Sequence, residues 1–381
     1  MEALLLMSPG PTMVPEKVMQ AGALPMINHR SEEFELTLRS TLDNLKTIYG
    51  TKDNVFVLAG SGRTGVEAAL INSMSPGDRV LVGINGNFGE MMATICKEMG
   101  YDVVPVWPDW NRPIDPQAVE DALKKDGAIK TVAVVHNETS TGTVNDIRTL
   151  ADVAHRHDCI IVVDGVSSVG GMPINMDEWG IDMCATGSQK CLMSPPGLGI
   201  VGVRQAVWER VNKAKSPRYY MDFRRFKEPA DKPMPQTPGT TSVSLVRCLD
   251  EACKMIVCEG TEKVYARHVK LAAATRLGIT ALGLPLVPPE PAQSSPTLVT
   301  AGIQNSGAFL DMVMKEHNLH IGRGLGKWAK DTFRIGVMGE AARPEHILRT
   351  LELMGEALAK HGLTKTPADA GVKAAKACLA K

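Results

Sequence analysis

Two side chains of opposite charge lie at the ends of apolar segments near the middle of the chain. Asp164 ends the segment Cys159–Asp164, and Lys190 comes shortly after the strand-like segment Ile181–Thr186. A buried carboxylate is costly unless a cation pairs with it. A lysine at the end of an apolar strand is desolvated, so it loses its proton more readily, and its neutral amine can bond an aldehyde. The two residues therefore predict catalysis with an aldehyde cofactor whose protonated ring nitrogen pairs with Asp164.

The residues around Lys190 strengthen this prediction. Gly187 allows a close backbone approach, and Ser188 and Gln189 carry side-chain donors that suit a phosphate. Each charged residue also has a purely structural interpretation. Asp164 alone could cap the following turn, and an isolated lysine is usually a solvated surface residue. The combination of these groups at neighbouring strand ends favours the chemical interpretation.

A glycine-rich turn, Gly60–Gly65, follows one predicted strand and precedes a predicted helix. Its G-x-G-x-x-G spacing matches the fingerprint of dinucleotide-binding sites. That fingerprint also requires an acidic residue about 20 positions later, at the end of the next strand, whereas the segment Arg79–Gly86 contains no carboxylate. We therefore interpret the turn as a cradle for a single phosphate, held by backbone N–H groups and a helix dipole. A tight turn that binds no ligand is the alternative.

Three further positions offer groups that such a cofactor and its substrate need. The polar turn Asn137–Gly142 carries hydroxyl groups that can contact a phenolic oxygen, although such turns often serve only as helix caps. Phe88 follows a predicted strand and can stack on a planar ring, or belong to the core. Arg334 interrupts an apolar strand and can bind a substrate carboxylate through two N–H donors, or form a structural salt bridge.

These residues need a scaffold that brings the ends of several strands together. Strands rich in Val, Ile and Ala that alternate with helices are typical of an α/β fold, with a mostly parallel sheet covered on both faces. Ligands bind such sheets at the carboxyl ends of the strands. The predicted strands are Asn54–Ala59, Arg79–Ile84, Asp102–Pro105, Thr131–His136, Cys159–Asp164 and Met183–Thr186, and the predicted helices are Thr64–Ser73, Phe88–Met99, Pro116–Lys125 and Ile147–His157.

The second half of the chain contains two Pro-rich interruptions on either side of a long helical region, Val243–Leu282. The first, Ser216–Gly239, is predicted to be a structured loop outside the sheet, and the second, Pro285–Pro296, a domain boundary. We expect an N-terminal segment over residues 1–20, a large cofactor-binding domain over 21–282 and a small α+β domain over 283–381. The elements expected in the small domain are strands Leu298–Gly302 and Thr332–Val337, helices Gly307–His317 and Pro344–Lys360, and a terminal helix or tail within Leu363–Lys381.

Composition and charge restrict the class of function. Basic and acidic residues balance at 42 each among 381 residues, so no net field attracts nucleic acid or an anionic membrane. No stretch of about 18 uninterrupted apolar residues predicts a membrane span, and the N-terminus lacks the basic region of a signal peptide. The eight cysteines form no CxxC pair, which indicates reduced core thiols in a cytoplasm rather than metal ligands. We therefore expect a cytoplasmic protein that acts on small molecules and needs no metal.

Taken in order, these motifs resemble those of the class V aminotransferases. This family is a branch of the fold-type I enzymes that depend on pyridoxal 5′-phosphate (PLP), and it includes alanine–glyoxylate and serine–glyoxylate aminotransferases. The resemblance runs from Ser8–Pro11 to about Gly339, and it implies a large domain with a mostly parallel seven-stranded sheet and a small α+β C-terminal domain. The motifs that carry it are Gly60–Gly62, Glu138–Gly142, Val163–Asp164, Gly170–Gly171, Gly187–Lys190, Pro195–Gly197 and Arg334–Gly336.

The resemblance implies a role for each residue of the predicted site. Lys190 would bond PLP as a Schiff base and later move a proton between the substrate and the cofactor, and Asp164 would pair with the pyridine nitrogen. Gly10 and Arg334 would bind the substrate, with Arg334 on its α-carboxylate. The other expected cofactor contacts are Ser61, Gly62 and Gln189 at the phosphate, Thr139 at the phenolic oxygen, Phe88 and Val166 against the ring, and Arg63 beside them.

Three positions bear on assembly and on the choice of substrate. Family members are homodimers in which the partner subunit completes the phosphate site, and Thr240 within Thr237–Thr241 is the matching residue here. Phe88 stands where many relatives have a tryptophan, which preserves a stacking face. Arg63 is similar to the residue of ureidoglycine–glyoxylate aminotransferases, whereas relatives specific for alanine and glyoxylate often carry a histidine or a small residue there.

We expect transamination from a small amino acid of the alanine or serine type to a 2-oxo acid such as glyoxylate or pyruvate. Ureidoglycine–glyoxylate aminotransfer is the alternative that Arg63 favours. A cysteine desulfurase on the same fold is another, although that family usually has a histidine where this chain has Gln189. The missing acid disfavours an NAD-dependent dehydrogenase, and the complete set of lysine, aspartate and arginine disfavours a non-catalytic binding protein.

Overall fold

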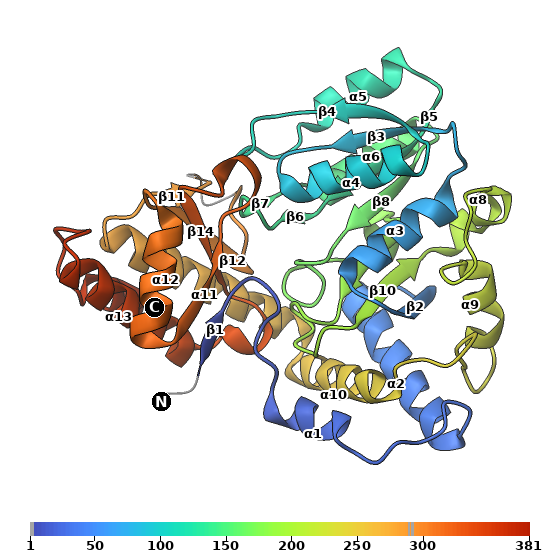
Figure 1. The fold of residues 1–381 in the computed structure, drawn as a ribbon. Helices are drawn as coiled ribbons and strands as arrows, with labels where there is room; N and C mark the ends of the chain where they lie inside the picture. The colour runs from blue at the N-terminus through green and yellow to red at the C-terminus, as the bar shows by residue number, and fades with distance from the viewer. Residues whose placement is uncertain (1–3, 289, 291–292) are drawn as a thin grey trace.

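The computed structural model describes residues 4–288, 290 and 293–381. The chain builds a larger part around a seven-stranded sheet and a smaller part around a five-stranded sheet (Figure 1). This arrangement confirms the predicted fold, an α/β domain with a mostly parallel sheet and a smaller α+β domain.

Seven strands form the large sheet: β2 (Asn54–Ala59), β3 (Arg79–Gly83), β4 (Asp102–Val106), β5 (Ile129–Val135), β8 (Ile160–Asp164), β9 (Met183–Gly187) and β10 (Leu198–Val203). Their spatial order is β2-β10-β9-β8-β5-β3-β4. β10 runs antiparallel to both of its neighbours, and all the other pairs are parallel. The carboxyl ends of the other six strands therefore meet at one edge of the sheet.

Helices cover both faces of this sheet because side chains along its strands alternate between two cores. In β5, Val132 and Val134 belong to one apolar cluster, and Ala133 and Val135 belong to the other. The helices that pack on the first face are α2 (Glu32–Tyr49), α5 (Pro116–Lys125), α6 (Ile147–Arg156) and α10 (Val243–Glu259). Those on the second face are α3 (Gly62–Ser73), α4 (Asn87–Glu98), α8 (Trp208–Lys213) and α9 (Phe223–Ala230).

The sequence analysis does not predict β10. Its sequence contains Gly199 and Gly202, and glycine weakens the strand pattern. These glycines allow close approaches: a Cβ atom on Gly199 would lie 2.5 Å from the carbonyl oxygen of Ser61, at the start of α3. Glycine in β10 therefore lets the first turn of α3 lie directly against the sheet.

Two other predicted segments differ in detail. The region Ser216–Gly239, predicted as a loop, contains α9, whose Phe223 and Phe226 pack into the core of the second face. The long helical region Val243–Leu282 consists of two helices, α10 and α11 (Thr261–Ala281), because the chain turns at Gly260 with φ of 90°.

The smaller part consists of a five-stranded sheet and the helices beside it. The strands are β1 (Leu5–Met7), β11 (Leu286–Val287), β12 (Leu298–Gly302), β13 (Leu319–Arg323) and β14 (Thr332–Gly336), in the spatial order β1-β13-β14-β12-β11. Figure 1 shows the blue N-terminal strand β1 beside the orange and red strands of this sheet, where it pairs in parallel with β13. The helices are α11, α12 (Ser306–His317), α13 (Pro344–Lys360) and α14 (Ala370–Leu379).

Helix α11 contributes to both hydrophobic cores. Its Val264 and Tyr265 pack with the large sheet, whereas Leu271 and Ile279 pack with the small one. The domain limits 1–20, 21–282 and 283–381 stay predictions. Residues 1–3 of the predicted N-terminal segment, and residues 289, 291 and 292 of the predicted boundary stretch, lie outside the described residues.

The remaining described elements are short: α1 (Glu16–Gly22), α7 (Met176–Trp179), the paired strands β6 (Asn137–Glu138) and β7 (Thr143–Val144), and 3-10 turns at Gln205–Val207, Gly326–Trp328 and Gly339–Ala341. Within residues 4–288, 290 and 293–381, no helix combines the length and the apolar character needed to cross a bilayer.

Candidate active site

A cavity of about 250 Å³ lies where the strands of the large sheet end. Its wall comes from segments that follow β2, β3, β5, β8 and β9, together with the N-terminal segment around Gly10. Every predicted site residue except Thr240 and Arg334 lines it. The full lining is Gly10, Pro11, Ser61, Gly62, Arg63, Val66, Phe88, Met91, Val135, Thr139, Asp164, Val166, Gln189 and Lys190.

Lys190 lies shortly after β9, and its side chain is partly buried. Its Nζ donates a hydrogen bond of 2.5 Å to the carbonyl oxygen of Pro9. Burial, followed by the positive charge of Arg334, lowers the pKa of Lys190 from 10.5 to about 8. A Cβ atom on Gly10 would overlap the end of the Lys190 side chain, so this position requires glycine. The neutral amine is therefore much more populated near neutral pH than in an exposed lysine.

Asp164 is the last residue of β8 and is 4% exposed. Its register pairs it with Val135 on one side and with Ala185 on the other. Its Oδ1 accepts a hydrogen bond of 2.9 Å from the backbone N–H of Val166. Burial raises the pKa of Asp164 from 3.8 to about 6, against the opposing effect of that N–H group. An acid in this environment is stabilised as an anion when a cation binds next to it.

The first turn of α3 forms one end of the cavity. Ser61, Gly62 and Arg63 lie there, and the backbone N–H of Ser61 donates to Thr64 Oγ1 at 3.1 Å, which fixes the turn. The first N–H groups of a helix have no acceptor within the helix, and the helix dipole favours an anion beside them. A Cβ atom on Gly62 would lie 2.7 Å from Cγ2 of Val166, so glycine is needed for this close packing.

Gln189 contributes to the same end of the cavity. Its side-chain Oε1 is buried and has no hydrogen-bond partner among the described residues. The Nε2 group of the same amide is the part that can donate to a phosphate, because an amide oxygen can only accept. Arg63, by contrast, is exposed at the cavity wall. This end of the cavity therefore offers helix N–H groups, an amide and a guanidinium, a set of groups that suits a phosphate.

Thr139 lies on the cavity wall in the turn after β5. Its Oγ1 is 2.6 Å from Oγ of Ser167, and Ser167 Oγ donates to the carbonyl oxygen of Asn137 at 2.9 Å. All three residues are buried. The hydroxyl of Thr139 is thus held in place by its neighbour, and it can contact a polar atom of a ligand.

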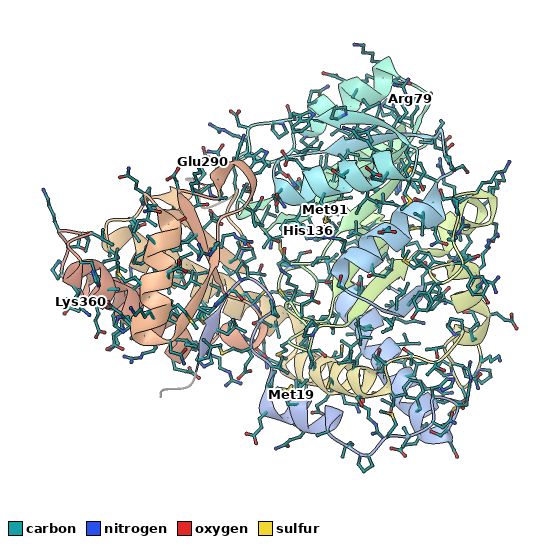
Figure 2. All side chains as sticks on the ribbon, in the orientation of Figure 1. Met19, Arg79, Met91, His136, Glu290 and Lys360 are labelled. Atoms are coloured by element: carbon teal, nitrogen blue, oxygen red, sulfur yellow. The ribbon has the colours of Figure 1, made fainter. Side chains whose placement is uncertain are left out.

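Two apolar side chains offer faces for a planar ring. Phe88, in the first turn of α4, and Val166, after β8, are both half-buried and line the cavity. Met91 lies one helical turn after Phe88, on α4, and lines the same wall (Figure 2). A flat aromatic ligand would have apolar contacts on these surfaces.

Arg334, in the middle of β14, connects the small sheet to the cavity wall. Its side chain is buried, with Nε donating to the carbonyl oxygen of Arg323 at 2.8 Å and Nη1 donating to that of Thr139 at 3.3 Å. Burial lowers the pKa of Arg334 from 12.5 to about 10, and the negative charge of Glu138 opposes this change. Because both acceptors are carbonyl oxygens, the guanidinium keeps N–H donors for a carboxylate ligand.

Thr240 does not line the cavity of Lys190. It is exposed and lines a second cavity of about 460 Å³, together with Arg30, Tyr219 and Tyr220. Within one chain, the described residues therefore do not bring Thr240 to the cavity of Lys190.

Several residues of this site are not predicted from the sequence. Pro11, Val66, Met91 and Val135 line the cavity, and Ser167 supports Thr139 from behind. Helical spacing could have found two of them, because Met91 follows Phe88 by three positions and Val66 follows Gly62 by four. No local pattern indicates Ser167, whose contact depends on pairing between β5 and β8.

The residues present fit the PLP that the sequence resemblance implies. A buried acid, a lysine with a lowered pKa and the N-terminus of a helix line one cavity. These match the ring nitrogen, the aldehyde and the phosphate of PLP in chemical type.

Comparisons with known proteins agree with this set of site residues. Residues 4–325 match the model of the family described as aminotransferase class-V. An uncharacterized aminotransferase of Methanocaldococcus jannaschii is 38% identical, with 99% of this chain and 98% of that protein covered. An L-aspartate–glyoxylate aminotransferase of Paracoccus denitrificans is 36% identical, with 87% and 85% covered. The crystal structure of a ureidoglycine–glyoxylate aminotransferase from Bacillus subtilis has a TM-score of 0.95 at 26% identity and covers 100% of this chain and 99% of that one.

Proposed function

The chain belongs to the class V aminotransferases and is therefore an aminotransferase that depends on PLP, and we propose that it moves the amino group of a small amino acid to a 2-oxo acid. The acceptor we propose is glyoxylate or pyruvate, since the similar proteins from P. denitrificans and B. subtilis are named for glyoxylate. The donor we propose is of the alanine or serine type, with ureidoglycine as the alternative. The observation that carries the proposal is that Asp164 ends β8, Lys190 follows the adjacent strand β9, and both line one cavity.

We assign the cofactor contacts from the groups around that cavity. Lys190 would hold PLP covalently, and Asp164 would pair with its ring nitrogen. The phosphate would bind at the first turn of α3, and Thr139 would contact the phenolic oxygen. The remaining cofactor contacts in this proposal are Ser61, Gly62, Arg63, Phe88, Val166 and Gln189.

The reaction needs a group that moves a proton and a group that orients the substrate. When bound, PLP withdraws electrons from the α-carbon of the substrate through its protonated ring. Asp164 would pair with the protonated ring nitrogen. The Nζ of Lys190, with its pKa lowered to about 8, would serve as the group that accepts and donates the substrate proton. Arg334 binds the α-carboxylate, and Gly10 leaves room beside Lys190 for the reacting atoms.

A panel of donors and acceptors tests this proposal. Purified enzyme loaded with PLP should transfer the amino group of alanine or serine to glyoxylate, or that of serine to pyruvate, at least about tenfold faster than to 2-oxoglutarate. Amines without an α-carboxylate should be inactive, because Arg334 would have nothing to bind. The rate of 2-oxo acid formation from each donor is the measurement. Activity with ureidoglycine alone would support the alternative substrate, and sulfide release from cysteine in place of transamination would contradict the proposal.

We also propose that the enzyme is a homodimer with shared active sites, in which Thr240 of one chain reaches the cofactor phosphate of the other. Thr240 lies between two surface cavities, one next to Met26 and one next to Tyr219 and Tyr220. These three apolar residues are strongly exposed, and so is Met19 of α1, which projects from the surface (Figure 2). Large exposed apolar side chains next to both cavities favour a protein interface around Thr240.

Substitution of Met26 by Asp is expected to separate the dimer and to weaken PLP binding together. Met26 is 70% exposed in the single chain, so the monomer should still fold, whereas a charge buried in an interface costs several kcal/mol. We expect a monomer by sedimentation and an increase in the Kd of PLP of about tenfold. Exposed Leu363 offers a matched site outside this surface, and Leu363→Asp should change neither quantity. A monomer with unchanged affinity would disprove the sharing of sites.

We propose a cytoplasmic location for the enzyme. All eight cysteines are free thiols, and six of them are buried. A reducing compartment keeps such thiols unpaired.

A further inference from the structure

Glu138 is a buried acidic residue that the proposed reaction does not use. It lies in β6, immediately before Thr139, and it is 0% exposed. Its Oε2 accepts hydrogen bonds of 3.1 Å from the backbone N–H groups of both Phe88 and Gly89. Its Oε1 accepts from the backbone N–H of Ser140 at 3.0 Å and from Ser140 Oγ at 2.5 Å. A fully buried carboxylate is stable only when its oxygen atoms are satisfied in this way.

These contacts replace the usual cap of helix α4. The residue before the helix is Gly86, which has no side chain to accept a hydrogen bond. A Cβ atom there would overlap Glu138, and it would lie 2.5 Å from Ser140 Oγ. Ser140 Oγ also accepts from the backbone N–H of Asn87 at 2.9 Å. The first three N–H groups of α4 are therefore capped by Glu138 and Ser140, which lie some 50 positions away in sequence.

The capped turn carries the proposed stacking residue. Phe88 is one of the residues whose N–H binds Glu138, and its side chain lines the cavity of Lys190. The backbone of Phe88 can shift only if a buried, charge-assisted hydrogen bond breaks, and such bonds are stronger than neutral ones. The negative charge at the positive end of the helix dipole adds to this stability.

The hydrogen-bond donors around Glu138 suit a carboxylate anion. All of its hydrogen-bond partners are N–H groups except Ser140 Oγ, and N–H groups can only donate. Burial raises the pKa of Glu138, and the hydrogen bonds from Ser140, Gly89 and Phe88 oppose that change. The charge of Glu138 in turn raises the pKa values of Arg334 and Asp164. Glu138 thus lies within electrostatic range of two proposed functional groups.

We propose that Glu138 is a positioning residue: its carboxylate fixes the first turn of α4 so that the Phe88 ring is held against the cofactor ring. This inference rests on the proposed contact between Phe88 and PLP. A cap with a purely structural role would stabilise the protein without changing how tightly or in which orientation PLP binds.

A double-mutant cycle separates the two roles. Glu138→Gln keeps the size of the side chain but replaces one acceptor oxygen by a donor, so the cap is broken. We expect it to raise the Kd of PLP about tenfold and to reduce the visible circular dichroism of the bound cofactor. In the background of Phe88→Ala, the same change should raise the Kd less than about twofold, because its effect passes through the ring. Equal effects in both backgrounds would overturn the proposal.

Two further variants keep the test decisive. Asp146→Asn removes an acidic cap from α6, where Asp146 accepts from the N–H and the hydroxyl of Thr149. It should lower the Tm without changing the Kd of PLP, and a tenfold change in that Kd would refute a specific role for Glu138.

If Glu138→Gln does not fold, Ser140→Ala removes one hydroxyl from the same cap. It should raise the Kd of PLP about threefold in the wild-type background but not in the Phe88→Ala background. If Phe88→Ala alone leaves the Kd unchanged, the placement of Phe88 fails, and this inference fails with it.

Discussion

Replacement of Lys190 by alanine is expected to abolish transamination and the covalent attachment of PLP. The amine of Lys190 lies in the cavity with a pKa of about 8, so about a quarter of it is neutral at pH 7.5, against about one part in a thousand for an ordinary lysine. Only the neutral amine bonds an aldehyde. Since we propose that the same nitrogen also moves the substrate proton, we expect the rate to fall by at least about a thousandfold.

Borohydride reduction followed by mass spectrometry measures the attachment directly. Wild-type enzyme should carry the mass of reduced PLP on the peptide that contains Lys190, and Lys190→Ala should carry none. Lys130→Ala is the matched control, because Lys130 lies on the same sheet in β5 but forms an ion pair with Asp158 at the surface, at 3.3 Å. It should behave as wild type. A cofactor found on any other lysine of the wild-type protein would show that the assignment of Lys190 is wrong.

The parts of this site that the sequence predicts share one property: each depends on a local pattern. Asp164 and Lys190 stand out because an apolar strand precedes each of them, and Gly62 stands out because glycine spacing marks a strand-to-helix turn. Parallel strands bring their carboxyl ends together, so these local features are sufficient to place the residues in one cavity.

The parts that the sequence does not predict depend on contacts between distant segments. Gly10 enters the predicted site only through the family resemblance, because its need for glycine comes from its φ of 122° and from the side chain of Lys190, some 180 positions later. Glu138 caps a helix that begins 50 positions earlier, and a carboxylate inside a polar turn has no feature that indicates such a partner. The pairing of β1 with β13 joins the N-terminus to the small sheet, and hydrophobic periodicity contains no information on which strands pair.

Replacement of Asp164 by asparagine is expected to reduce transamination by roughly a hundredfold and to remove one pH dependence of PLP binding. Asparagine has nearly the same shape but no charge, so it cannot keep the ring nitrogen protonated. In the free protein the pKa of Asp164 is about 6, and a cation beside it lowers that pKa. The affinity due to the proposed pair of Asp164 and the ring nitrogen should therefore be fully present above about pH 6, and it should be lost as the pH falls below that value.

We would measure the PLP affinity of wild type and of Asp164→Asn between pH 5 and pH 8 and take their ratio at each pH. This ratio isolates the effect of Asp164, because the titration of Lys190 is common to both proteins. At pH 5 roughly a tenth of Asp164 is ionised in the free protein, so the ratio should fall about tenfold from its value at pH 7.5.

Asp182→Asn is the matched control, since Asp182 is another buried acid of the sheet, at the opposite end of β9, and accepts from the N–H of Ile161 at 2.9 Å. It should lower the Tm but leave PLP affinity and its pH profile as in wild type. A ratio that stays constant across this range would mean that Asp164 does not face the ring nitrogen, because no other buried acid lines this cavity among the described residues.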